Sequence, residues 1–285
     1  MFHWWPKSLR RFSLRSLLVV MTIACGICAV VCLHLRNRGR VQAIKQHVAA
    51  AGGRSYVFGY NRRLQLASSF TANLDLHLSE LSPSAFDSLE KVPALIDTTR
   101  NQRVESVILW RGRGEVDWKR TQSLIDSLAP RDLLLNGIRC DEAAALINGR
   151  KCKYLFLKSS AIPVDAYSID LHCEELQFSG PGFDLFWQRV TSQSTVSKVY
   201  LTAGSPNEVQ NFHRIPSLKD VRLDAGHWDE CDVCQLMAKL DGVFVRLKCC
   251  GLNEEQKLRL ESAFVRYLIL EVRDCNCTST LDPFG

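Results

Sequence analysis

The first 74 residues of this 285-residue chain contain no aspartate or glutamate, since the first acidic residue is Asp75. Eleven of the 36 lysines and arginines lie in that stretch, which leaves 25 basic and 30 acidic side chains and a net charge of −5 on the remainder. The whole chain carries +6. A basic head on a mildly acidic body indicates that the positive charge serves one surface. The 46% hydrophobic content excludes disorder as the default state.

Charge is also missing from residues 16–35, SLLVVMTIACGICAVVCLHL. As a helix, this run would be about 30 Å long, which matches the hydrocarbon core of a bilayer. We therefore predict a transmembrane helix over 16–35. A cleaved signal peptide is an alternative, but no A-x-A cleavage site precedes the arginines at 36, 38 and 40. A buried helix of a soluble protein is the other alternative.

We therefore expect the chain to be a single-pass membrane protein, with the lipid bilayer as one of its partners. Residues 1–15 form a basic tail, and the basic residues on the two sides of the apolar run are nearly balanced in number. The positive-inside rule therefore gives only a small preference for one orientation of the helix, and we expect the N-terminus in the cytoplasm. No basic stripe with interleaved aromatics occurs in the rest of the chain, so nucleic acid is not an expected partner.

Beyond the apolar run, residues 36–54 predict a short juxtamembrane helix and linker. Val41, Ile44 and Val48 share one helical face, and a Gly-Gly pair supplies a stop. The stretch SYVFGY is typical of a strand. This arrangement of anchor, arginine-rich exit, helix, Gly-Gly and aromatic strand resembles the head of many predicted single-pass membrane proteins of planctomycete bacteria. That resemblance covers about sixty residues and implies no chemistry.

The second part of the chain repeats a short apolar-x-apolar motif that is typical of buried strands. The intervals between successive motifs are 26, 22, 21, 23, 22, 24 and 23 residues, a mean of 23. This period lies within the range of leucine-rich repeats. The eight motifs are Val107/Leu109, Leu133/Leu135, Leu155/Leu157, Leu176/Phe178, Val199/Leu201, Val221/Leu223, Val245/Leu247 and Leu268/Leu270.

Other positions follow the same period. Apolar residues recur three positions before the motif, at Cys152, Cys173, Val196, Leu218 and Val265, and seven positions after its start, at Cys140, Ile162, Phe183, Trp228, Leu252 and Cys275. The pieces SPNEVQNFHRI, with Pro206, and NEEQKLRLESAF, with an Asn253-x-x-Gln256 cap, are typical of helix starts.

Over residues 104–273 the chain thus resembles a leucine-rich-repeat solenoid, which implies an α/β fold of parallel strands alternating with helices. One departure is that only Cys250 occupies the Asn/Cys position of the repeat and no Asn does. An open α/β sheet with irregular crossovers is the alternative. Residues 55–103 fit the period badly, so we expect them to form an N-terminal cap, and we expect 274–285 to be a C-terminal tail.

Motifs of known enzyme classes are missing. The chain has no G-x-S-x-G elbow, no G-x-x-x-x-G-K-[ST] loop and no complete G-x-G-x-x-G. The segment HWDECDVCQLM offers His227, Cys231 and Cys234 as candidate ligands, with Cys249 and Cys250 nearby. A membrane-tethered enzyme or a metal or redox protein using that region is the alternative function. We predict that the two C-x-x-C thiols instead pack within a helix, and we predict no cofactor.

The leading function is protein binding on a leucine-rich-repeat-like scaffold. Side chains alternate along a strand, so the residue between the two apolar positions points out on the concave sheet. That column reads Ile108, Leu134, Phe156, Gln177, Tyr200, Arg222, Arg246 and Ile269, flanked by Trp110, Tyr154, Phe244 and Tyr267. Aromatics and arginines are enriched in binding hot spots, so we expect a protein partner over Phe156, Tyr200, Arg222 and Arg246. The alternative is that these side chains only stabilise neighbouring strands.

Overall fold

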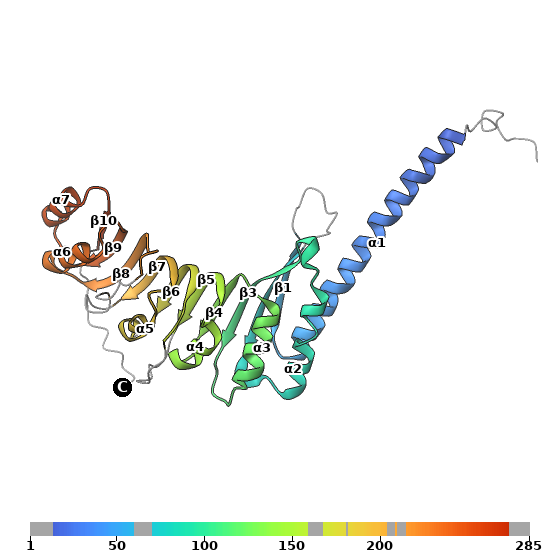
Figure 1. Cartoon of the computed structure of the whole chain (residues 1–285), viewed down its shortest axis with the longest axis horizontal. Helices are drawn as coiled ribbons and strands as arrows, with labels where there is room; N and C mark the ends of the chain where they lie inside the picture. The colour runs from blue at the N-terminus through green and yellow to red at the C-terminus, as the bar shows by residue number, and fades with distance from the viewer. Residues whose placement is uncertain are drawn as a thin grey trace, which may run out of the picture.

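The computed structural model describes residues 14–59, 70–158, 168–180, 182–203, 209 and 215–273. Within this part of the chain ten strands form one sheet, and their order in space follows their order in sequence (Figure 1). The strands are β1 (Arg54–Gly59), β2 (Phe70–His77), β3 (Arg103–Trp110), β4 (Asp132–Asn136), β5 (Lys151–Lys158), β6 (His172–Ser179), β7 (Thr195–Ala203), β8 (Asp220–His227), β9 (Phe244–Cys250) and β10 (Leu268–Val272). The fold is therefore mixed α/β.

Parallel pairing dominates the sheet. The first strand, β1, is antiparallel to β2, and every later neighbouring pair is parallel. The helices between strands are α2 (Pro83–Leu89), α3 (Trp118–Leu128), α4 (Cys140–Ile147), α5 (Phe183–Arg189), α6 (Glu230–Lys239) and α7 (Glu254–Ala263), and the 3-10 turns are η2 (Leu78–Glu80), η3 (Pro93–Leu95) and η4 (Thr98–Arg100). Each crossover thus returns the chain to the same end of the next strand.

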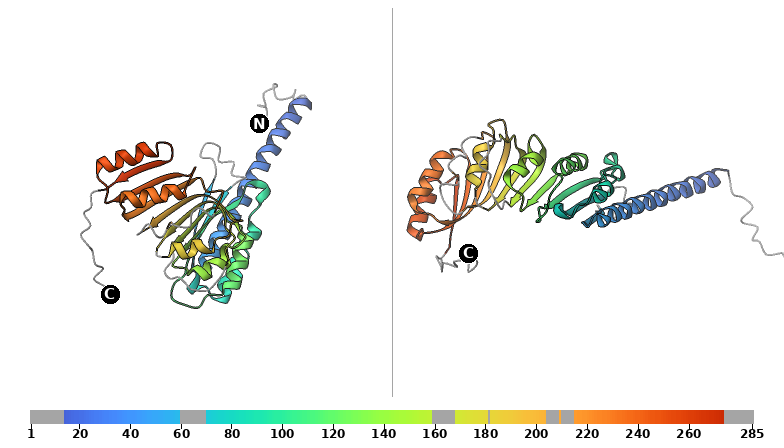
Figure 2. Two further views of the ribbon diagram at one scale, coloured as in Figure 1. Left: turned by 60° about the vertical axis from the view of Figure 1, so that its left-hand side comes forward. Right: turned by 90° about the horizontal axis from the view of Figure 1, so that it is seen from below.

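The eight predicted strands are confirmed as β3 to β10. All sixteen motif residues are buried, with exposed fractions of 4% or less. They align across the sheet, as Leu133 does with Leu155 and Leu155 with Leu176. Because side chains alternate along a strand, this alignment places one continuous apolar surface under the helices. Figures 1 and 2 show α3, α4 and α5 in one layer on one side of the strands.

Aromatic side chains fill the middle of this core. Phe183, Phe186 and Trp187 of α5 are buried. The Phe178 ring of β6 lies edge-on to Phe183 at 5.2 Å between centroids, and Phe183 stacks on Trp187 at 5.3 Å. Such pairs contribute about 0.5–1.5 kcal/mol beyond the burial of their surface. The short helix α5 is therefore stabilised mainly by packing of its aromatic side chains against the sheet.

The parallel part of the sheet begins one strand earlier than the repeat pattern predicted. The strand β2 pairs in parallel with β3, and its Leu74 and Leu76 are buried like the motif residues. Leu74 precedes Val107 by 33 residues, because α2, η3 and η4 lie between the two strands. This longer connection explains why residues 55–103 fit the period badly. The predicted strand SYVFGY is confirmed in β1 over residues 55–59, and its last residue, Tyr60, lies outside the described residues.

The predicted membrane and juxtamembrane segments form a single helix, α1 (Leu14–Ala50), of 37 residues. Its amino-terminal part is long and apolar enough to cross a membrane, with a mean hydropathy of 2.7 over the best window and none of that window buried. Figure 1 shows this part extending away from the sheet. The helix ends before Gly52, which has a φ of +74°. Glycine adopts this left-handed conformation at little steric cost and commonly ends helices.

The other end of α1 is built into the protein. Ile44 and Val48 are fully buried in the same core as the strands, as the spacing predicted. Buried Gln102 donates from its Nε2 to Asn37 Oδ1 at 3.1 Å and accepts from Arg40 Nη1 at 3.2 Å. The same Gln102 oxygen accepts from the Asp97 backbone N–H at 3.1 Å. Helix α1 is therefore fixed to the first part of the sheet by apolar packing and by a buried amide.

Several secondary positions differ from the repeat pattern or lie outside the described residues. Val265 is 75% exposed, so its predicted core role is wrong, whereas Phe183, Trp228 and Leu252 are buried as predicted. The Asn253 cap is confirmed, because its side chain accepts from the Gln256 N–H at 2.8 Å. Outside the described residues lie the tail 274–285 with Cys275, most of the basic tail 1–15, Ile162, and the helix predicted after Pro206 except Val209 and Ile215.

Candidate functional site: the open face of the sheet

The residues between the buried motif positions lie side by side on the face of the sheet opposite the helices. Backbone pairing aligns Ile108 through Ile269 in one row across eight strands. All members of the row are half-buried or exposed, in contrast to their buried neighbours. The open face therefore carries Phe156, Tyr200, Arg222 and Arg246 in one row, as the alternation predicted.

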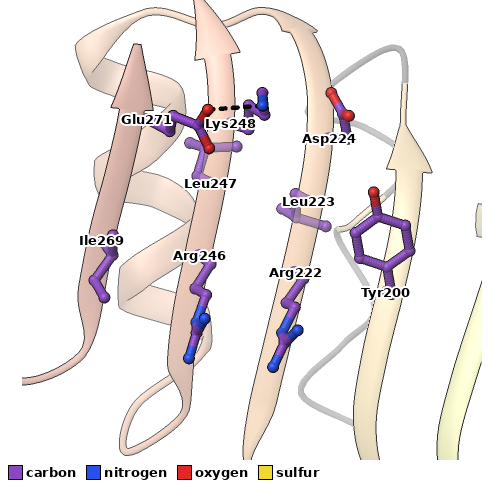
Figure 3. A pocket seen from close by; sticks show the side chains of 9 residues that line it. All are labelled: Tyr200, Arg222, Leu223, Asp224, Arg246, Leu247, Lys248, Ile269 and Glu271. Atoms are coloured by element: carbon purple, nitrogen blue, oxygen red, sulfur yellow. Dashed lines mark ion pairs between the residues drawn. The ribbon is translucent and has the colours of Figure 1, made fainter.

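Three of the four predicted site residues line a common hollow. It has a volume of about 390 Å³ and lies over β7 to β10 (Figure 3). Phe156 lies two strands away from Tyr200 and is not part of the lining. The lining consists of Tyr200, Arg222, Leu223, Asp224, Arg246, Leu247, Lys248, Ile269 and Glu271. Sequence periodicity found the row, but it did not find that the row is hollowed at one end.

One rim of the hollow consists of paired charges. Lys248 Nζ lies 2.7 Å from Glu271 Oε1, and this hydrogen bond holds the pKa of the Glu271 carboxyl below its usual value. Arg273 Nη2 lies 3.0 Å from Asp224 Oδ2. These four side chains, from β8, β9, β10 and the residue after β10, neutralise one another's charge. The rim is therefore nearly neutral.

The floor of the hollow is positively charged. Arg222 and Arg246 are direct neighbours on β8 and β9, and both are exposed. Figure 3 shows both guanidinium groups directed to the same side, toward the amino-terminal ends of their strands. Arg222 Nη2 reaches Asp220 Oδ2 only at 3.5 Å. Among the described residues Arg246 has no carboxylate partner, and its guanidinium lies 5.3 Å from the centroid of the Phe244 ring.

Elsewhere on the open face the side chains bind one another. The Tyr154 hydroxyl donates to Gln177 Oε1 on the next strand, and burial, with the carboxylates of Glu175 and Asp132, raises the Tyr154 pKa. Trp110 Nε1 donates to Asp75 Oδ1 at 2.6 Å. At these positions neighbouring strands are stabilised as the alternative interpretation expected. The hollow at β7 to β10 differs from them because its central cations lack strong partners.

The candidate metal ligands lie apart from this face. His227 ends β8, and Cys231 and Cys234 are exposed on α6. The predicted helix packing of the two thiols is therefore wrong, because α6 packs through Val233, Leu236 and Met237 instead. In the ranges that the structure describes, no group of three or more His, Cys, Asp or Glu side chains is arranged to hold a metal ion.

The Cys231 sulfur accepts instead from Gln235 Nε2 at 3.3 Å. Partial burial and the Glu230 carboxylate raise the pKa of the Cys234 thiol. A thiol with a raised pKa is a weaker nucleophile and a weaker ligand at neutral pH. Nothing in this geometry favours redox or metal chemistry at α6.

A second cysteine pair was not predicted as a pair. Cys152 of β5 and Cys173 of β6 are aligned on neighbouring strands, and their thiols are in hydrogen-bond contact. That contact and burial raise the pKa of Cys173, whereas the same contact lowers the pKa of Cys152. The signal was present in the sequence, because both residues occupy the position three before the motif. Cys173 is buried in the core and Cys152 is half-buried against it, which agrees with the predicted core role.

Comparison of the chain with protein-family models, with curated proteins and with solved structures gives no match. The site must therefore be interpreted from its own geometry: one end of an open sheet face, hollowed, with two neighbouring arginines between a tyrosine and an isoleucine.

Proposed function

We propose that this chain is a single-pass membrane protein that presents a leucine-rich-repeat-like domain to a protein partner. Helix α1 supports the anchor, because its apolar part is unburied and extends from the sheet. A run of about twenty apolar residues inserts far more strongly than surface charge binds to headgroups. The orientation with the N-terminus in the cytoplasm places the sheet on the opposite side of the membrane.

The repeat interpretation is supported by the regular strand order. Successive strands of β3 to β10 are neighbours, all parallel, and separated by about 23 residues. The alternative is an open α/β sheet with irregular crossovers. Open α/β sheets of the doubly wound type reverse their strand order at a switch point, whereas the described strands follow one another in sequence order. Cys250, the one residue that matches the Asn/Cys position of the leucine-rich repeat, is buried. The antiparallel strand β1 and helix α2 would serve as the N-terminal cap of such an array.

The observation that carries the binding proposal is the hollow lined by Tyr200, Arg222 and Arg246. Concave surfaces of repeat proteins are extended binding surfaces, and tyrosine and arginine are enriched among residues that dominate binding energy. Structural residues on the same face are paired with each other, whereas the two arginines keep exposed guanidinium groups. A protein surface is the partner that this combination fits best.

The test is a pull-down from native membranes with the variant Phe156→Ala/Tyr200→Ala/Arg222→Ala. The matched control is Lys119→Ala/Gln235→Ala/Lys239→Ala, which changes three exposed residues of the helices α3 and α6. We expect proteins captured by wild type and by the control to be lost from the open-face variant at equal thermal stability. An unchanged set of captured proteins, with the variant folded, would refute binding on this face.

A further inference from the structure

We propose that the partner segment is acidic and seats a carboxylate between the guanidinium groups of Arg222 and Arg246. This inference rests on the proposed function, because it names the chemistry of what the open face binds. Its basis is the unequal pairing of the charges around the hollow.

The charges at the hollow leave one cation unmatched. Lys248 and Arg273 each have a carboxylate at 2.7 and 3.0 Å. Arg222 has a single longer contact of 3.5 Å, and within the described ranges Arg246 has none. An incoming carboxylate is therefore the group that completes the arrangement.

The geometry suits a carboxylate. Arg222 and Arg246 are aligned on neighbouring parallel strands, so their backbones are about 4.8 Å apart. Two arginines fixed side by side repel each other in the free protein, and an anion between them removes that repulsion. The planar guanidinium group binds carboxylates through two parallel hydrogen bonds, which adds direction to the charge attraction. Both groups are exposed and directed to the same side, so one ligand can reach both (Figure 3).

The flanking residues indicate a protein segment as the source of the carboxylate. In the same row Tyr200 lies beside Arg222, and Ile269 lies beside Arg246. Ile269 is 48% exposed, so it offers apolar surface beside the charge. From Tyr200 to Ile269 the row crosses three strand spacings, about 14 Å, which an extended segment of four to five residues spans. We infer a short extended segment with a central Asp or Glu between apolar side chains.

The experiment uses the full chain in nanodiscs of phosphatidylcholine, whose headgroups carry no net charge, and a displayed library of random short peptides as the probe. Selected peptides are expected to be enriched in Asp and Glu next to apolar residues. The variant Arg222→Gln/Arg246→Gln should bind them at least about tenfold more weakly. Binding by wild type should also weaken from 0.1 M to 1 M salt, as the Debye length falls from about 10 to about 3 Å.

The matched control is Lys119→Gln/Lys239→Gln, which removes the same charge from exposed residues of α3 and α6. It should bind the peptides as wild type does, and an equal loss in both variants would overturn the proposal. Apolar peptides that depend on Phe156 and Tyr200 but not on the arginines would overturn the acidic partner and leave the protein-binding function in place. Peptides that ignore the open face, or no selected peptide at all, would count against both.

Discussion

Gln102 and Asn37 are 65 positions apart, yet their buried side chains share a hydrogen bond of 3.1 Å. This bond joins the helix that carries the apolar run to the residue before β3. Because Gln102 also accepts from Arg40, the helix cannot rotate freely about its axis relative to the sheet. A membrane anchor attached in this way would orient the open face with respect to the bilayer rather than tether it through a flexible linker.

Loss of this junction should therefore be costly. The change Gln102→Ala removes the hydrogen bonds that Gln102 makes to the buried Asn37 side chain and to the Asp97 backbone N–H. Buried unsatisfied groups cost about 1–3 kcal/mol each, so we expect the free energy of unfolding in detergent micelles to fall by about 2–4 kcal/mol. Gln46→Ala, at an exposed site of α1, is the control and should change stability by less than about 0.5 kcal/mol. Equal effects of both changes would refute the role of the junction.

The two faces of the sheet should respond differently to the same substitution. Leu133 and Leu134 are adjacent in β4, but Leu133 is fully buried under the helices and Leu134 is half-buried on the open face. We expect Leu133→Ala to lower the free energy of unfolding by about 2–5 kcal/mol, because it leaves a cavity in the core. Leu134→Ala should cost about 1 kcal/mol or less, as measured by urea unfolding. A larger effect at Leu134 would mean that the open face is packed.

This alternation shows what the sequence could predict. Buried motif residues such as Leu133 and Leu135 repeat with a strand period and a regular interval, so eight strands and their outward rows followed from spacing. The pairing of β2 with β3 was not predicted, because the connection between them is longer than the repeat interval and Leu74 therefore does not fit the period. Local signals, such as the Asn253 cap, were also readable because they need only four neighbouring residues.

The rest depends on side chains that meet across the fold. Gln102 and Asn37 follow no period, so their bond could not be predicted from spacing. Cys231 and Cys234 looked like helix-packing residues, but the buried face of α6 is set by Val233, Leu236 and Met237. The position of Arg246 in the row was predictable. That none of the described carboxylates pairs with Arg246 was not predictable, because this depends on where distant acidic residues pair.

Asp132 should make stability depend on pH. Burial raises the pKa of Asp132 above its usual value, and the like charge of Glu105 raises it further. Its Oδ1 is buried and has no hydrogen-bond partner among the described residues. The folded state then binds more protons than the unfolded state between the two pKa values, so stability falls as pH rises through that window.

Asp132→Asn removes this dependence. At pH 7 we expect it to raise the free energy of unfolding by at most about 1 kcal/mol, since the site is only half-buried. The gain should shrink toward zero as pH falls below the usual pKa of aspartate. Urea unfolding of both proteins between about pH 3 and pH 7, a range that begins below the usual aspartate pKa of about 3.9, measures the difference. A gain that grows on acidification would contradict the raised pKa.

The exposed thiols of α6 can report the orientation in the membrane. In a background with Cys275→Ser and Cys277→Ser, a membrane-impermeant maleimide should label Cys231 and Cys234 from outside intact cells, if the N-terminus lies in the cytoplasm. The labelling should be lost in Cys231→Ser/Cys234→Ser. Labelling only in inside-out vesicles would reverse the orientation. Extraction of the chain by salt or carbonate washing would contradict the membrane anchor itself.

The most direct test of the account is site-specific photo-crosslinking in native membranes. A photoreactive benzoylphenylalanine replaces Tyr200 in the hollow or, as the control, Lys119 on the exposed side of α3. The account predicts a discrete protein adduct from the Tyr200 position that disappears when Arg222→Gln/Arg246→Gln is added, and no such adduct from position 119. Adducts from position 119 alone, or an adduct at position 200 that is indifferent to the two arginines, would contradict it.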